Sequence, residues 1–158
     1  MLGPMGSGKT TFALKISNDT GAIFYSLDKT IKEFNLPIYS FKDYESNVEK
    51  ALGLLRAKAI QSLNKGHSVV FDFGGGTAHW SWLKNISDSA KVNIEIYSFE
   101  VPTEERISRV RKRNREKPKD IYYFTMSDEE FYQSKNKCET PPPNENLKIT
   151  RVSNFIAN

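Results

Sequence analysis

Apolar residues along the chain follow two patterns that alternate with each other. Short, mostly apolar runs have the length of strands buried inside a parallel sheet. Between these runs, apolar positions fall three and four residues apart, which is the spacing of an amphipathic helix. The sequence therefore predicts strands at residues 22–27, 68–71, 92–99 and 147–152.

The clearest helical pattern covers residues 43–65. Its apolar positions share one face, and Gly66 follows where a helix commonly ends. Further helices are predicted from residue 9 onward, around residues 80–86, from Thr103, whose hydroxyl we expect to act as the N-cap, and from Ser127. The last of these has the spacing of a capping box, because Glu130 follows Ser127 by three positions.

Strands that alternate with helices predict an α/β fold, with a parallel sheet between two layers of helices. A chain of 158 residues with 38% hydrophobic content is long enough for one core, so we expect a single domain over residues 1–158. A phosphate-binding loop normally follows a central strand, but only Met1 and Leu2 precede Gly3. The first strand is therefore expected to be truncated or vestigial.

Composition narrows the class of protein without identifying it. The one cysteine, Cys138, excludes an internal disulfide framework, and no apolar stretch reaches the roughly 20 residues that span a bilayer. No secretory signal is visible either, so a cytoplasmic protein is expected. The net charge of +4 fits nucleotide phosphates, nucleic acid or a merely basic surface. The oligomeric state is left open.

The pattern Gly3-x-x-x-x-Gly8-Lys9-Thr10 is the strongest motif in the chain. Its glycines allow backbone N–H groups to surround phosphate oxygens, while the lysine reaches the β- and γ-phosphates and the threonine can bind Mg²⁺. A helix is predicted to follow directly. The motif therefore predicts ATP and Mg²⁺ as ligands of residues 3–11, which we call the phosphate loop: Gly3, Pro4, Met5, Gly6, Ser7, Gly8, Lys9, Thr10 and Thr11.

Two aspartates follow predicted strands and are candidates for the chemistry. Asp72 is placed where a Walker B carboxylate would help Thr10 to hold the metal, although a strand-end turn would also favour an aspartate there. Asp28 is expected at the same edge of the sheet, where it would act as the base for an attacking hydroxyl. It could also serve as the N-cap of a short helix. The two aspartates could exchange these roles.

A strongly basic helix is predicted after Thr103. Guanidinium groups at helical spacing are suited to clamp the phosphates of a nucleotide, as the arginines of a lid do. Arg109 and Arg113 are four residues apart, share one face, and are the candidates for this role within a lid around residues 106–125. The alternative is a solvated basic face paired with nearby glutamates.

Other chemically capable side chains have no pattern that assigns them a role. His67 and His79 lack metal-ligand spacing to each other or to Cys138, so we expect no zinc site. The aromatic residues of the second half could line an acceptor pocket, but residues of this kind are more typical of a core. These are Trp80, Trp82, Tyr122, Tyr123 and Phe124.

With these motifs the chain resembles the AAA-like family of small P-loop kinases, whose relatives include polynucleotide kinase, zeta toxin and chloramphenicol phosphotransferase. The resemblance rests on the phosphate loop and on four looser matches, Ser26-Leu27-Asp28, residues 70–74, Arg113-Asn114 and residues 139–142. It implies a base at Asp28, a nucleotide-site carboxylate at Asp72, and lid arginines at Arg109 and Arg113. Residues 75–80 depart from the pattern of the relatives, so the resemblance does not predict which residues form the acceptor site.

These observations predict an ATP-dependent phosphotransferase that moves the γ-phosphoryl group to a hydroxyl of a small-molecule acceptor. Lys9, Asp28, Arg109 and Arg113 are the candidate catalytic residues, and Thr10 and Asp72 the candidate metal ligands. One alternative is a polynucleotide end kinase or another nucleic-acid-binding NTPase. A second alternative is a non-catalytic nucleotide-binding domain. The resemblance does not identify the acceptor.

Overall fold

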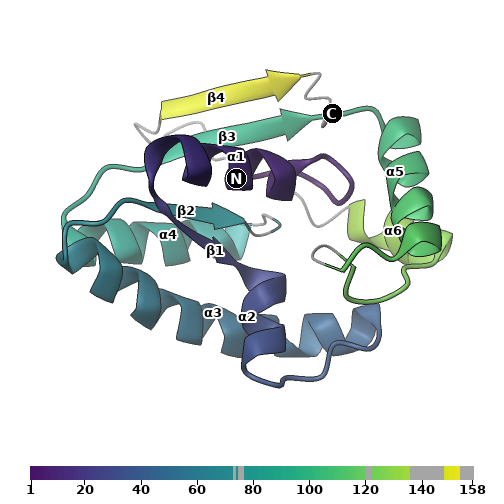
Figure 1. The fold of residues 1–158 in the computed structure, drawn as a ribbon, viewed down its shortest axis with the longest axis horizontal. Helices are drawn as coiled ribbons and strands as arrows, with labels where there is room; N and C mark the ends of the chain where they lie inside the picture. The colour runs from purple at the N-terminus through teal and green to yellow at the C-terminus, as the bar shows by residue number, and fades with distance from the viewer. Residues whose placement is uncertain (73, 75–76, 120–121, 136–147, 154–158) are drawn as a thin grey trace.

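The computed structural model describes residues 1–72, 74, 77–119, 122–135 and 148–153. Strands and helices alternate along most of its length, as the sequence predicted (Figure 1). The elements in chain order are α1 (Lys9–Thr20), β1 (Ile23–Ser26), α2 (Leu27–Glu33), α3 (Phe41–Asn64), β2 (Val69–Asp72), α4 (Thr77–Ala90), β3 (Glu95–Glu100), α5 (Thr103–Glu116), α6 (Asp128–Lys135) and β4 (Lys148–Ser153).

The strands form two parallel pairs, β1 with β2 and β3 with β4. The start of the chain lies between the pairs. The amide of Leu2 donates to the carbonyl of Tyr97 at 2.8 Å, and its carbonyl accepts from the amide of Phe99 at 2.9 Å. On the other side, the amino group of Met1 donates to the carbonyl of Phe71 at 2.7 Å. A single parallel bridge at Leu2 thus occupies the position between β2 and β3.

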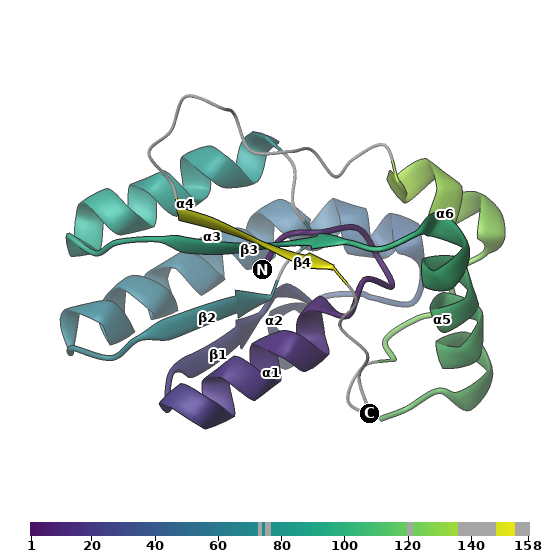
Figure 2. The same ribbon diagram turned by 90° about the horizontal axis from the view of Figure 1, so that it is seen from above.

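Helices cover both faces of the β1–β2 pair, which confirms the predicted three layers (Figure 2). On one face, α1 packs Ala13 against Val70 of β2. On the other face, the ring of Phe71 meets Trp82 of α4 at 5.1 Å, and the indole of Trp82 donates to the carbonyl of Leu52 in α3 at 3.1 Å. Val70 and Phe71, which are neighbours in β2, therefore pack against helices on opposite faces of the sheet, because side chains alternate along a strand.

The first predicted strand ends earlier than expected. Residues 27 and 28 belong to α2, because the Ser26 hydroxyl accepts the amide of Lys29 at 3.4 Å and so caps a new helix. The prediction that Asp28 ends a strand is therefore wrong, and so is the alternative that Asp28 is the N-cap. Asp28 lies instead in the first turn of α2, where a negative charge is favoured near the helix N-terminus.

Two other predicted helix starts are confirmed, although the cap expected for the first of them is wrong. Pro102 is the N-cap of α5 and supplies no side-chain hydrogen bond, so Thr103 is the first helical residue rather than the cap. For α6, the capping box is confirmed. The Ser127 amide donates to the carboxylate of Glu130 at 2.7 Å, and the Glu130 amide donates to the Ser127 hydroxyl at 3.2 Å.

The third strand begins later than predicted, at residue 95 rather than 92. The amide of Val92 donates to the carbonyl of Ser87 at 3.2 Å, and the hydroxyl of Ser87 donates to the carbonyl of Val92 at 2.5 Å. These bonds use the backbone of Val92 to close the end of α4, so Val92 is not available for strand pairing.

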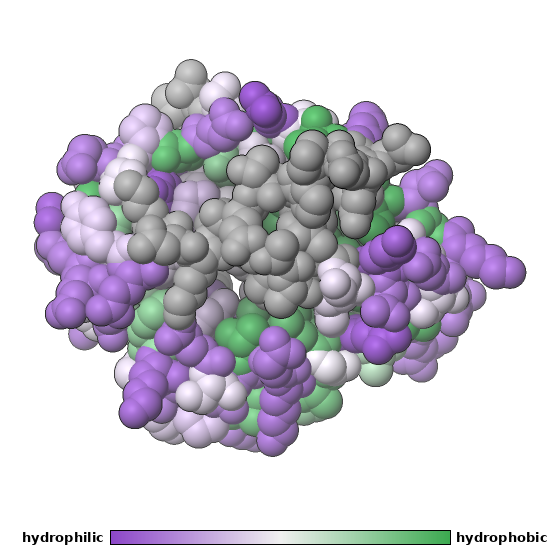
Figure 3. Space-filling view, turned by 180° about the vertical axis from the view of Figure 1, so that it is seen from behind, coloured by the Kyte–Doolittle hydropathy of each residue, from purple (hydrophilic) through white to green (hydrophobic). Residues whose placement is uncertain are grey.

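At the carboxyl ends of the strands stand α5 and α6 (Figure 1). From behind, polar side chains cover much of the described surface at both ends of the molecule, and smaller apolar patches lie between them (Figure 3). Among the described helices, none combines the length and the apolar character that crossing a membrane requires.

Candidate functional site

A cleft of about 680 Å³ lies at the carboxyl ends of β1 and β2. Its walls come from the phosphate loop, from the N-terminal ends of α2 and α3, and from α5. The predicted site residues that line it are Met5, Gly6, Gly8, Lys9, Thr10, Thr11, Asp28, Asp72, Arg109 and Arg113. Gly3, Pro4 and Ser7 belong to the phosphate loop but lie outside the lining. The structure thus places both aspartates and both arginines around one cavity.

The phosphate loop has a backbone that only glycine adopts readily at three positions, the first of which is Gly3 with φ 149°. Gly6 has φ 77° and Gly8 has φ 93°. A Cβ on Gly6 would also lie 2.5 Å from the carbonyl oxygen of Arg106, so α5 packs directly on the loop. Gly8 is the N-cap of α1 and offers no side chain to its first-turn amides. The amides at the start of α1 therefore have no side-chain acceptor, and they lie beside the cleft, where a phosphate group could accept from them.

Lys9 and Thr10 open α1 at the edge of the cleft. The ammonium of Lys9 donates to the carbonyl of Pro4 at 3.0 Å, which holds the cation against its own loop. The hydroxyl of Thr10 and the carboxylate of Asp72 line the same cavity, and oxygen atoms of these kinds are the ligands that Mg²⁺ prefers. No cluster of three or more His, Cys, Asp or Glu side chains suited to a metal occurs among the described residues. Thr10 and Asp72 thus fit a Mg²⁺ ion that would take its remaining ligands from bound phosphate groups and water.

Asp28 is the carboxylate with the most unusual surroundings. Burial raises the pKa of Asp28 to about 6, and the negative charge of Asp72 adds to the effect. Arg113 and Lys9 lower this pKa, and the phenol of Tyr44 does so to a smaller extent. The Asp28 side chain is half-buried. Its charged neighbours are one acid, Asp72 of β2, and two cations, Lys9 of α1 and Arg113 of α5.

Asp72 is almost fully buried, at 6% exposure, at the end of β2. It pairs in register with Ser26, which caps the helix that carries Asp28. The two aspartates thus start from neighbouring strand ends, although Asp28 comes from the helix that follows. This explains how both reach the same cleft despite the wrong strand boundary.

The arginines of α5 have different surroundings in the structure. Arg109 donates to the carbonyl of Gly6 at 3.4 Å and pairs with Glu105. Arg113 also lies in the cleft, with its guanidinium 3.7 Å from the sulfur of Met5, and burial lowers its pKa. Within the described part of the chain, no carboxylate lies within ion-pair distance of Arg113, and its buried Nε has no hydrogen-bond partner.

Arg106 and Arg111 do not line the cleft, and each has partners elsewhere in the protein. Arg106 is buried and donates to the carbonyl of Val101 and to the hydroxyl of Thr103, each at 3.1 Å. Its third donor reaches the carbonyl of Met5 at 3.4 Å, so Arg106 ties α5 to the phosphate loop. Arg111 is exposed and pairs with Asp128 of α6 at 2.5 Å.

Sequence reasoning missed Tyr44 altogether. It lies in the first turn of α3, lines the cleft, and contributes to lowering the pKa of Asp28. No motif marks it, because its position in the cleft depends on where α3 packs against α2.

The aromatic residues of the second half of the chain divide between the cleft and the core. Tyr123 lines the cleft, while Trp82 and Phe124 pack in the core. The predictions at Cys138 and residues 139–142, and those that concern the side chains of His79 and Trp80, lie outside the described residues.

Comparison with known proteins agrees with the architecture. The family model AAA_33, described as an AAA domain, matches residues 1–141. A shikimate kinase from Buchnera aphidicola subsp. Schizaphis graminum is 28% identical over 118 residues, which is 75% of this chain. The aligned part spans 65% of the length of that relative.

Two solved structures share the fold. One is a sugar kinase from a Janibacter species, with a TM-score of 0.64 at 17% identity, covering 95% of this chain and 82% of the other. The second is a protein assigned as a kinase from Chloroflexus aurantiacus, with a TM-score of 0.74 at 14% identity, covering 96% and 83%. The predicted α/β fold of the P-loop kinases is thus confirmed.

Proposed function

The chain belongs to the AAA_33 family of AAA domains, and on that premise we propose that it transfers the γ-phosphoryl group of ATP to a hydroxyl of a small-molecule acceptor. The observation that carries the proposal is the position of Asp28, in the same cleft as the phosphate loop. Two of the similar proteins are named for small acceptors, shikimate and a sugar. Phosphoryl transfer needs a positioned nucleotide and a positioned nucleophile, and the cleft has residues for each.

The nucleotide would lie on the phosphate loop. Backbone amides at the start of α1 would hold its phosphates, Lys9 would exchange the carbonyl of Pro4 for phosphate oxygens, and Arg109 would lie above the loop. A bound Mg²⁺ would neutralise charge on the phosphates, and Thr10 with Asp72 are the residues that would hold it.

Asp28 would serve as the general base. The acceptor hydroxyl would give its proton to the Asp28 carboxylate as the oxygen attacks the γ-phosphorus in line. A pKa of about 6 keeps most of this carboxylate ionised at pH 7, yet makes it a stronger base than an ordinary aspartate. Arg113, placed between the base and the phosphate loop, would stabilise the charge that develops during transfer.

The test begins with a panel of metabolites and antibiotics that is screened for ATP consumption. With an acceptor in hand, Asp28→Asn should lower kcat by about 10²–10⁴-fold while ATP still binds. Asp19→Asn is the matched control, because Asp19 forms an exposed ion pair with Lys15 on α1, far along the helix from the cleft. Full transfer by the Asp28→Asn variant would show that Asp28 is not the base.

The charges of α5 favour a small acceptor over a nucleic acid. Arg109 pairs with Glu105, Arg111 pairs with Asp128, and Lys112 lies 3.9 Å from Glu116. Carboxylates therefore neutralise much of the basic helix on which the nucleic-acid alternative was based. Oligonucleotide binding that weakens steeply as salt rises would instead support that alternative. A failure to bind ATP with Mg²⁺ in calorimetry would support a non-catalytic domain.

A further inference from the structure

The guanidinium of Arg106 is a buried cation that joins three segments of the chain. The residue is 3% exposed, and its Nε donates to the carbonyl of Val101 while one terminal nitrogen donates to the hydroxyl of Thr103, each at 3.1 Å. The other terminal nitrogen donates to the carbonyl of Met5 in the phosphate loop at 3.4 Å. The guanidinium carbon lies 5.2 Å from the centre of the Phe131 ring in α6. A charge is buried at low cost only where its donors are satisfied, so these contacts fix the side chain in place.

The backbone of Arg106 contacts the same part of the loop. A Cβ added to Gly6 would lie 2.5 Å from the carbonyl oxygen of Arg106 and 3.1 Å from its Cα. The Cα of Gly6 is therefore packed against the main chain of α5, while the side chain of Arg106 reaches the carbonyl just before it. Arg106 thus contacts the loop on both sides of the peptide bond that joins Met5 to Gly6.

The direction of this peptide group decides where the N–H of Gly6 points. No peptide bond of the described residues is cis, and in a trans peptide the C=O and the N–H point in opposite directions. The Met5 carbonyl points toward Arg106, which does not line the cleft. The N–H of Gly6 therefore points away from Arg106, and Gly6 is one of the loop residues that line the cleft. A phosphate group in the cleft could accept from this N–H.

Glycine alone would not hold the peptide group in this direction. A peptide group turns over when ψ of the residue before it and φ of the residue after it change together, and glycine accepts φ of either sign. The turned group would present the Met5 carbonyl oxygen to the phosphates in place of an N–H donor, and so set a negative dipole end against an anion. The bond from Arg106 opposes this rotation, because a charged donor forms a stronger hydrogen bond than a neutral one.

We propose that Arg106 is a positioning residue of the phosphate loop, which holds the peptide between Met5 and Gly6 so that the N–H of Gly6 donates to a phosphate of the bound nucleotide. This inference rests on the nucleotide-binding part of the proposed function and not on the acceptor or the base. Arg106 does not touch the nucleotide itself. It acts by preparing the loop before the phosphates arrive, so its effect is on nucleotide affinity, and ADP is a sufficient probe.

The experiment measures the Kd for ADP with Mg²⁺ by calorimetry, at a temperature where circular dichroism shows every variant to be folded. Arg106→Met should raise the Kd about tenfold, because one hydrogen bond to a charged group is lost. Arg106→Lys keeps the charge but not the fork of donors, and it should raise the Kd about three- to tenfold. This second variant carries the test if Arg106→Met does not fold.

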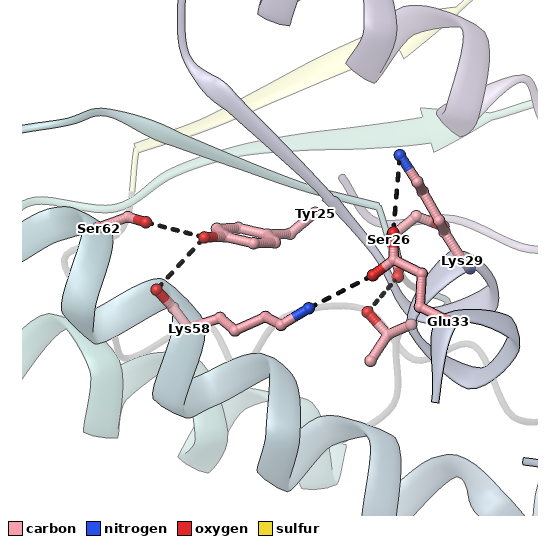
Figure 4. A network of polar contacts seen from close by, with 7 residues as sticks. Tyr25, Ser26, Lys29, Glu33, Lys58 and Ser62 are labelled. Carbon is pink, nitrogen blue, oxygen red and sulfur yellow. Dashed lines mark hydrogen bonds and ion pairs between the residues drawn. The ribbon is translucent and has the colours of Figure 1, made fainter. Parts of the chain in front are cut away.

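Two controls separate positioning from a general loss of packing. Leu55 is fully buried in α3 and does not line the cleft, so Leu55→Ala should destabilise the fold and leave the Kd within about twofold. The hydroxyl of Tyr25 is bonded to the hydroxyl of Ser62 at 2.8 Å and to the carbonyl of Lys58 at 3.3 Å, outside the cleft lining (Figure 4). Tyr25→Phe removes these bonds and should leave the Kd unchanged. A Kd that rises as much in the controls as in Arg106→Met would overturn the inference.

The NMR signal of the Gly6 amide gives a second readout that reports on the peptide itself. In the wild type, ADP should move this signal strongly, because the N–H forms a bond to a charged oxygen. In Arg106→Met at saturating ADP, the shift should be much smaller. The amide of Gly53, in the middle of α3, is the internal reference and should not move in either protein. An equal shift of the Gly6 signal in the two proteins would overturn the inference.

The same measurements distinguish a failure of this inference from a failure of the proposed function. A wild-type protein that does not bind ADP with Mg²⁺ would overturn the proposed function, and the inference with it. A wild-type protein that binds ADP, together with an Arg106→Met variant that binds it equally well, would overturn the inference alone. Loss of phosphoryl transfer in Asp28→Asn concerns only the base and leaves the expected effect of Arg106 on ADP affinity in place.

Discussion

The two walls of the cleft are built in different ways. The nucleotide wall is one continuous stretch of chain, residues 3–11, whose shape follows from glycine backbone conformations and from the start of α1. The base wall gathers Asp28, Tyr44 and Arg113 from three helices, α2, α3 and α5. The first wall is a property of local sequence, whereas the second exists only when the helices pack correctly. Variants on the two walls should therefore fail for different reasons.

The largest effect is expected on the nucleotide wall, from Lys9→Met. Removal of the ammonium group that would reach the phosphates should lower ATP turnover by about 10³-fold or more, because phosphoryl transfer depends on charge stabilisation. The fold should be retained, since Lys9 is only half-buried. Steady-state assays with circular dichroism measure both properties. Lys15→Met, on an exposed position of α1, is the control and should keep wild-type turnover.

Gly6→Ala tests whether the nucleotide wall depends on backbone shape. A Cβ at this position meets the Arg106 carbonyl at 2.5 Å, and the residue has φ 77°. Strain and overpacking together should cost about 2–4 kcal/mol of unfolding free energy. In contrast, Gly53→Ala in the middle of α3 meets no atom within 4 Å and should stabilise the protein slightly. Denaturant unfolding of both variants would contradict this account if their stabilities were equal.

The same contrast explains what the sequence could predict. The phosphate loop, the capping box of α6 and the placement of Arg109 and Arg113 on one face follow from spacing alone. Local rules determine such features, so they are readable without a structure. The start of α2 was misjudged because residues 22–27 are nearly all apolar, and only the cap formed by Ser26 shows that the strand stops there.

Tyr44 and Arg106 could not be found in this way. Tyr44 lines the same cleft as Asp28 only because two helices pack together, and nothing in the residues around it differs from an ordinary helix start. Arg106 lies in a run of arginines whose other members face solvent or the cleft, yet it is buried and holds the phosphate loop. Burial is a tertiary property, and identical residue types along one helix conceal it.

On the base wall, Asp28→Asn should affect stability and activity in opposite directions. The folded protein raises the pKa of Asp28 from an ordinary aspartate value to about 6, so ionisation of this group opposes folding above the unfolded-state pKa near 4. The neutral variant should therefore be more stable at pH 7 by about 1–2 kcal/mol. The advantage should shrink as pH falls from 6 and vanish below about pH 4. Thermal unfolding across this range measures it, and an advantage that persisted at pH 3 would contradict the cause.

The pH profile of ATP turnover gives the smallest expected effect. If Asp28 is the base, activity should decline below about pH 6 as the carboxylate becomes protonated. Arg113 lowers the pKa of Asp28, so Arg113→Met should move this decline to higher pH by less than about one unit, apart from any loss in kcat. Arg111→Met removes a cation from the exposed face of the same helix and should leave the decline in place. Equal shifts in the two variants would show that Arg113 acts on Asp28 only through net charge, and not through its place on the base wall.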